Sequence, residues 1–210
     1  MYELLYKVMS SRVLSFFIIL LFCIRSAAAL EQNGLLLQLQ GGLARPLSPQ
    51  FITDYWDEGV TFSGAFGAAV SEMTVLLLCY NHFTFDYSAG IVPEDDHAAA
   101  HEVSVCCKRS LRRVGSRLSL FYQLGVGVTL LRSPMIYQES TLYPGVIDDE
   151  KILDPGHSQD GLTLLGGMGM NYSVVNEGTL FFVELFLSTS FSTPSIYSAI
   201  GGRCGVMFKI

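Results

Sequence analysis

The stretch from Leu118 to Leu130 constrains the fold more than any other part of the chain. Every second residue is Leu, Tyr or Val, and the residues between them are Ser, Phe, Gln, Gly and Thr. Side chains alternate between the two faces of a strand, so this pattern predicts a β-strand with one large apolar face. Similar stretches predict seven further strands: 35–44, 60–70, 74–86, 102–109, 162–173, 181–192 and 196–210. The phase of the alternation is ambiguous for 74–86, and 102–109 is short.

The last stretch, 196–210, needs a partner on its free edge. Ile200, Val206, Phe208 and Ile210 fall on one face, and no polar residue follows them in the sequence. An apolar strand with an unpaired edge is prone to aggregation, and closing the sheet removes that edge. Eight is an even number of strands, so the first stretch, 35–44, can close an antiparallel up-and-down barrel against 196–210.

The connections alternate in length along the chain. They are long after the first, third and fifth predicted strands and short after the second, fourth and sixth, whereas the last one, around Pro194, is short. Long loops outside and short turns in the periplasm are typical of transmembrane β-barrels.

The distribution of charge predicts which face meets lipid. Only 15% of all residues are charged, and 35–44, 60–70, 118–130 and 162–173 contain no Asp, Glu, Lys or Arg. The less apolar face is mostly Gly, Ser, Ala and Thr, which suits the narrow interior of an eight-stranded barrel better than a water-exposed surface. We therefore expect the large apolar side chains to face lipid rather than a soluble barrel's core.

The N-terminus has the pattern of an export signal. Lys7 and Arg12 precede an apolar core at 13–24, and small residues at 26–29 provide a cleavage site. We predict a cleaved signal peptide at 1–29 and a single barrel domain at 30–210. An uncleaved anchor is the alternative, but the apolar core is shorter than the roughly 18 residues that a spanning helix needs.

The terminal strand also carries a motif. Arg203, Gly205, Phe208 and Ile210 follow the pattern polar-x-Gly-x-x-aromatic-x-apolar. Together with the signal peptide and eight short strands, this resembles the small outer-membrane β-barrel family, the outer membrane protein A and X-like barrel domain. The resemblance implies that these four residues form the assembly signal read by the barrel-assembly machinery. Ile210 departs from the family, which usually ends in Phe.

One ion pair is predicted inside the barrel. Glu184 and Arg203 fall on the inward face of neighbouring strands, so we expect them to pair in the lumen. Removing one partner of a buried pair costs about 3–5 kcal/mol.

Two charged segments lie in connections. The stretch 94–102 is acidic, and it places His97 and His101 four residues apart, a spacing that would let a helix present both to one metal ion. A solvated loop is the preferred interpretation, and we predict no metal or cofactor. A basic turn holds Lys108, Arg109, Arg112, Arg113 and Arg117, and we expect it to contact anionic headgroups at the inner leaflet.

These patterns predict an outer-membrane protein with a structural, adhesive or surface-binding role. We expect no catalysis, because the sequence holds no GxSxG, HExxH or phosphate-binding loop. A net charge of −6 argues against nucleic-acid binding. The expected partners of this monomer are outer-membrane lipid, lipopolysaccharide and the barrel-assembly machinery. A narrow diffusion channel and a soluble periplasmic ligand-binding barrel are the alternatives.

Overall fold

The computed structural model describes residues 34–87, 91–93, 97–114, 117–139, 147–173, 179–192 and 195–210. The predicted signal peptide, 1–29, lies outside these residues. In the part of the chain that is described, no helix has the length and apolar character needed to cross a membrane.

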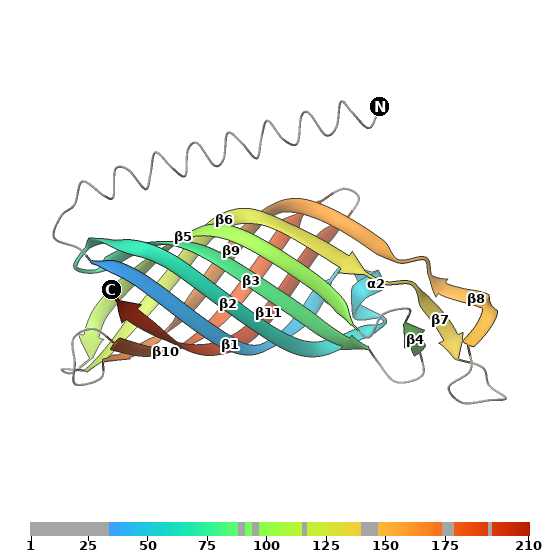
Figure 1. Ribbon diagram of the computed structural model, residues 1–210, viewed down its shortest axis with the longest axis horizontal. Helices are drawn as coiled ribbons and strands as arrows, with labels where there is room; N and C mark the ends of the chain where they lie inside the picture. Colours follow the sequence, from blue (N-terminus) through green and yellow to red (C-terminus); the bar gives the residue numbers. More distant parts are fainter. Residues whose placement is uncertain are drawn as a thin grey trace, which may run out of the picture. The chain divides into compact units, whose positions relative to one another are not determined.

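The described residues form one closed antiparallel barrel of eight strands (Figure 1). Around the barrel the order is β1, β11, β10, β9, β6, β5, β3 and β2, so each strand pairs with its neighbours in the chain and the first pairs with the last. This confirms the predicted up-and-down fold. The strands are β1 (Leu35–Ser48), β2 (Trp56–Ser71), β3 (Thr74–Tyr87), β5 (Ala98–Val114), β6 (Leu118–Ser133), β9 (His157–Ser173), β10 (Thr179–Phe191) and β11 (Ile196–Lys209).

The terminal strand closes the barrel as expected. β1 and β11 pair from Leu36 opposite Lys209 to Ala44 opposite Gly201 without a break in register. The backbone N–H of Ile210 donates to the carbonyl oxygen of Leu35 at 2.8 Å, which extends the pairing to the last residue of the sequence. The free edge of the last strand is thereby removed.

The barrel wall has its large apolar face outside and polar side chains inside, which is the reverse of a soluble β-barrel. Large apolar side chains lie outside, with Leu185 64% and Met168 68% exposed, whereas Gln38, Glu102 and Glu184 are fully buried inside. Exposing so much apolar surface on every strand is favourable only where lipid covers it. The prediction that the large apolar face meets lipid is thus supported, and the soluble ligand-binding barrel is not.

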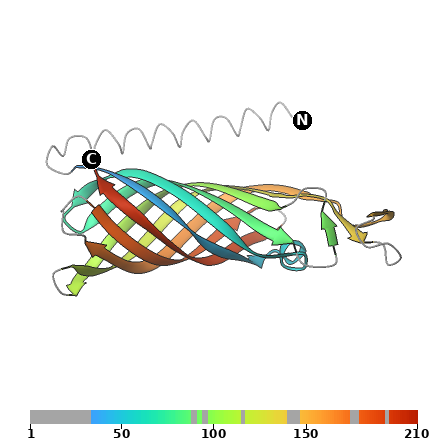
Figure 2. The ribbon, with the colours of Figure 1, turned by 60° about the horizontal axis from the view of Figure 1, so that its bottom comes forward.

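The two ends of the barrel differ. At one end β2 and β3 are joined by a two-residue turn, Glu72-Met73. At the other end lie α2 (Gln50–Thr53) and a separate three-stranded sheet of β4 (Ile91–Pro93), β7 (Ile136–Glu139) and β8 (Ile147–Asp154). β7 and β8 extend beyond the barrel strands that precede and follow them (Figure 2). Because long connections face outward in such barrels, we call this the extracellular end.

One predicted strand is too short. The fourth strand was expected at 102–109, but β5 runs from Ala98 to Val114. Its first residues are Ala98-Ala99-Ala100, which give no contrast between large apolar and polar side chains. Ala98 and Ala100 are fully buried within an aromatic cluster of the lumen, where larger side chains from other strands fill the space.

Candidate functional site

The extracellular half of the lumen is filled by apolar side chains, which we call the aromatic plug. Phe83 lies 5.9 Å from Phe186 between ring centroids, and Phe85 lies 6.4 Å from Tyr197. The indole N–H of Trp56 donates to Ser133 Oγ at 3.2 Å. The plug consists of Ile52, Trp56, Phe83, Phe85, Leu131, Ile136, Phe186 and Tyr197, all at most 2% exposed, together with four alanines.

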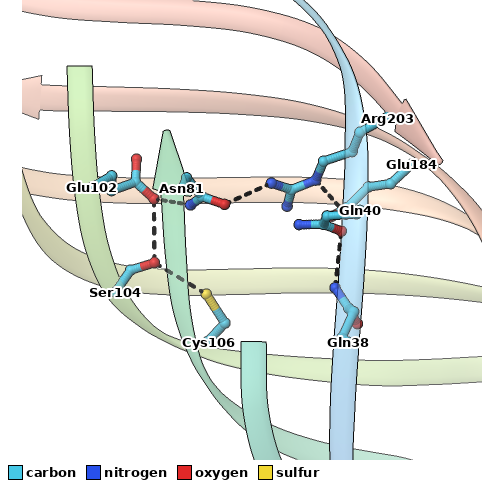
Figure 3. Close-up of polar contacts among 8 residues, drawn as sticks. All are labelled: Gln38, Gln40, Asn81, Glu102, Ser104, Cys106, Glu184 and Arg203. Atoms are coloured by element: carbon cyan, nitrogen blue, oxygen red, sulfur yellow. Dashed lines mark hydrogen bonds and ion pairs between the residues drawn. The ribbon is translucent and has the colours of Figure 1, made fainter. Parts of the chain in front are cut away.

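On the side of the plug away from the extracellular end lies a polar network, which we call the polar centre. It consists of Asn81, Glu102, Ser104, Glu184, Ser188 and Arg203, most of which are drawn in Figure 3. Glu184 on β10 and Arg203 on β11 are directly opposite in register. Arg203 Nε donates to Glu184 Oε2 at 2.9 Å, and both side chains are at most 1% exposed. The structure therefore brings together the two residues that the sequence predicts to pair.

The network continues across the barrel to β3 and β5. Arg203 Nη1 donates to Asn81 Oδ1 at 3.1 Å, and Asn81 Nδ2 donates to Glu102 Oε1 at 2.6 Å. Ser104 and Ser188 donate their hydroxyl groups to the same carboxylate, Glu102. The polar centre thus links four strands. Sequence reasoning did not single out Asn81, and it counted Glu102 as the end of an acidic connection, whereas Glu102 lies in β5 and is fully buried in the lumen.

Lys108 was assigned to the wrong place by sequence. It was expected in the basic turn at the inner leaflet, but its side chain is 3% exposed inside the lumen. Its Nζ lies 3.8 Å from the centroid of the Phe121 ring and 4.2 Å from that of Phe182. Lys108 and Arg109 are adjacent, so they point to opposite faces of β5, and only Arg109 is exposed. Arg117 is exposed as well.

The predicted assembly motif lies on both faces of β11. Arg203 points into the lumen, whereas Phe208 and Ile210 are exposed on the outside. A methyl group at Gly205 would lie 2.7 Å from Cζ of Phe182 and 2.7 Å from Cβ of Gln40. Gly205 is therefore required by packing, because the ring of Phe182, its partner in register, occupies the space above it. Its role in assembly stays a prediction.

The same arrangement recurs along the barrel. Phe186 is opposite Gly201 and Phe121 is opposite Gly169. A methyl group at Gly201 would meet Phe186 Cζ at 2.7 Å, and one at Gly169 would meet Phe121 Cζ at 2.8 Å. Inward glycines thus make room for inward rings on the neighbouring strand. A Phe on the inward face opposite a Gly of the neighbouring strand is a signal that could have indicated from the sequence how the lumen is filled.

The structure does not place His97 and His101 on a helix, and it places His101 in a strand rather than in the preferred solvated loop. His101 lies within β5 and His97 immediately precedes it, so the two do not share a helical face. Among the described residues, no group of three or more His, Cys, Asp or Glu is arranged to hold a metal ion. Glu94 lies outside the described residues.

No family model and no curated protein matches this sequence. Solved structures match its fold. Neisserial surface protein A is 10% identical, with a TM-score of 0.57 over 84% of this chain and 97% of that chain. This chain therefore has the fold of a small outer-membrane β-barrel.

Two further structures align over a similar part of the chain. The outer membrane protein OprG from Pseudomonas aeruginosa is 12% identical, with a TM-score of 0.49, over 84% of this chain and 96% of that chain. The N-terminal β-barrel domain of Pseudomonas aeruginosa OprF is 13% identical, with a TM-score of 0.45, over 85% of this chain and 100% of that chain.

Proposed function

We propose that this outer-membrane barrel is a closed scaffold that presents a binding surface at its extracellular end, without conduction and without catalysis. The observation that carries the proposal is the filled lumen. Small molecules would have to pass both the aromatic plug and the polar centre, and a role for the protein then rests on what its extracellular end contacts.

The charge of the lumen supports a closed barrel. The buried charged residues of the described barrel strands are Glu102, Glu184, Lys108 and Arg203, two acids and two bases. An ion pathway usually carries a ring of one sign or a hydrophobic constriction that can widen. Here Arg203 is bound on two sides by Glu184 and Asn81, so its guanidinium is held across the lumen.

The extracellular sheet supports a binding role. β4, β7 and β8 form a sheet of their own, in which β4 and β8 are the edge strands. The β8 segment contains Asp148, Asp149 and Glu150 in sequence. An acidic projection of this kind suits a basic partner surface, or divalent cations shared with lipopolysaccharide, because carboxylate oxygens are ligands for such ions.

A shortened β7–β8 hairpin tests the binding role. Ile136 and Asp154 are opposite in register, so residues 137–153 can be replaced by Asn-Gly, a two-residue turn suited to a hairpin. Ile136 stays in the plug. We expect bacteria that display the shortened barrel to attach less to host-cell and matrix surfaces than bacteria that display the full chain.

Two controls accompany this variant. D148N/D149N/E150Q keeps the hairpin and removes its charge, so it separates an electrostatic contact from a contact with the backbone. Heat-dependent gel mobility reports that each variant is folded. Undiminished attachment by the shortened barrel would contradict the proposed binding surface.

Conductance in planar bilayers tests the alternative of a diffusion channel. We expect no steps of conductance from the full-length barrel at neutral pH. A variant that removes the plug and the centre together, F83A/F186A/R203A, provides the positive control if it remains inserted. Regular conductance steps from the unmodified protein would favour the channel over the closed scaffold.

A further inference from the structure

The outer wall of the barrel carries a polar stripe on β3 and β5. Toward the extracellular end, the outward residues of β3 change from Leu76 and Leu78 to Tyr80 and then to polar side chains. On β5 the outward side chains also change from apolar to polar toward the extracellular end, where His101 lies. The neighbouring strands remain apolar, with Phe62 on β2 and Leu130 on β6 both more than half exposed. The stripe consists of Tyr80, His82, Thr84, Asp86 and His101, with His97 immediately before β5.

Three side chains of this stripe converge. His82 and His101 are directly opposite in the register of β3 and β5. Their Nδ1 atoms are 3.2 Å apart, and their ring centroids are 4.6 Å apart. The hydroxyl oxygen of Tyr80 lies 2.9 Å from His101 Nδ1. Two imidazole nitrogens and one phenol oxygen therefore meet at one point on the outside of the barrel.

The same side chains border a depression in the wall. It has a volume of about 560 Å³ and is lined by Leu39, Phe62, Gly64, Tyr80, His82 and His101, with Gln40 and Ser63. Gly64 has no side chain to fill it, and a methyl group there would meet only Leu39 Cδ2, at 3.9 Å. Tyr80, His82 and His101 thus line a depression on the outside of the barrel.

We propose that His82 and His101 bind a late transition-metal ion, Zn²⁺ or Cu²⁺, through their Nδ1 atoms, with Tyr80 at its edge. Neutral imidazole suits these ions. Two nitrogens about 2.05 Å from a tetrahedral Zn²⁺ ion lie about 3.3 Å apart, which is close to the observed separation of the two Nδ1 atoms. Because only two imidazoles take part, water or another external ligand completes the coordination.

The register of the sheet explains why these two histidines meet and His97 does not. Residues opposite each other in an antiparallel pair have Cβ atoms about 4.5–5.5 Å apart, whereas four residues of extended chain span about 13 Å. His97 precedes β5 and lies outside its register with β3, so it is not placed opposite His82. The proposed site is therefore the pair His82 and His101 on neighbouring strands, rather than His97 and His101, which are four residues apart in the sequence.

Metal titration of the refolded full-length barrel in detergent, without a histidine tag, tests the proposal. We expect saturable binding of one Cu²⁺ or Zn²⁺ per barrel at pH 7.5 and its loss in H82N and in H101N. The electron paramagnetic resonance spectrum of bound Cu²⁺ should show two nitrogen ligands in the unmodified protein. Binding should also weaken at acidic pH, because protonated imidazole is not a ligand.

The control variants are H97N and Y80F. H97N removes an exposed histidine of the same stripe and should bind the ion as the unmodified barrel does. Y80F should keep the two nitrogen ligands in the spectrum. Heat-dependent gel mobility shows that each variant is folded. The proposal is overturned if the folded barrel binds neither ion, if H82N and H101N bind normally, or if H97N loses binding.

Discussion

The two halves of the lumen are closed by different physical means. The aromatic plug is held by packing of side chains such as Phe83, Phe85 and Tyr197. Its described polar links are the hydrogen bond from Trp56 to Ser133 and the contact of the Arg203 guanidinium with the Phe186 ring, at 4.7 Å from the centroid. The polar centre is held by directional contacts between Arg203, Glu184 and Glu102 through Asn81. Packing weakens gradually as atoms are removed, whereas a buried charge network loses much of its stability when one partner is missing.

Removing the guanidinium of Arg203 should have the largest effect. R203M leaves Glu184 and Asn81 without their buried donor, so we expect the free energy of unfolding to fall by about 3–5 kcal/mol. Urea unfolding in lipid vesicles measures it, with fluorescence from Trp56, the only tryptophan in the sequence. E184L/R203M removes both charges and should lose less than R203M. If the loss of stability in E184L/R203M equals the sum of the losses in E184L and in R203M, Glu184 and Arg203 are not coupled.

Filling the space at Gly205 should have the next largest effect. The added methyl group of G205A meets the ring of Phe182 and the stem of Gln40, and overpacking of this kind costs about 1–3 kcal/mol. The matched control is G166A, because no heavy atom lies within 4 Å of a methyl group at that position. Refolding of the purified chain measures stability independently of the assembly machinery. Equal stability of the two variants would contradict the packing role of Gly205.

A change within the plug should have a smaller effect. F83L keeps an apolar side chain in place of the ring that contacts Phe186, so we expect a loss of at most about 1.5 kcal/mol. The same unfolding assay applies. A loss as large as that of R203M would mean that the plug is as intolerant of change as the polar centre.

Replacing Lys108 should have the smallest effect. Within the described residues its Nζ makes no hydrogen bond and contacts two aromatic rings. A methionine keeps the stem between Phe121 and Phe182 and removes the cost of burying an ammonium group, so K108M should change stability by less than about 1 kcal/mol. A loss of stability as large as that of R203M would show that the buried ammonium group of Lys108 stabilises the carboxylates of Glu102 and Glu184.

The fold could be predicted from the sequence because lipid imposes a strict period on the outer face. Leu118 to Leu130 reads as a strand at once, since large apolar residues recur at every second position. The start of β5 could not be read in this way. Ala98 and Ala100 are small because the rings of the plug occupy the lumen beside them, and that reason lies on other strands.

The candidate site could be predicted only where register and charge were both evident. Glu184 and Arg203 lie on adjacent strands joined by a short turn, so their pairing followed from the alternation. The pairing of His82 with His101 depends on the register between β3 and β5, which a ten-residue connection separates. The position of Lys108 in the lumen was missed because it was grouped with the arginines of the basic turn, whereas β5 continues to Val114.

The apolar outer face and the packed lumen also determine which positions of such a sequence can change during evolution. Outward positions such as Leu124, Met168 and Val183 contact lipid, which accepts most apolar side chains of any shape. Inward positions such as Arg203, Asn81 and Gly205 have specific neighbours that an exchange would disturb. Substitutions should therefore accumulate at every second residue along each strand, within the apolar residue types, while the residues between them change slowly. Descendants of one ancestral barrel would then share half of an alternating sequence, and their overall identity would understate their kinship.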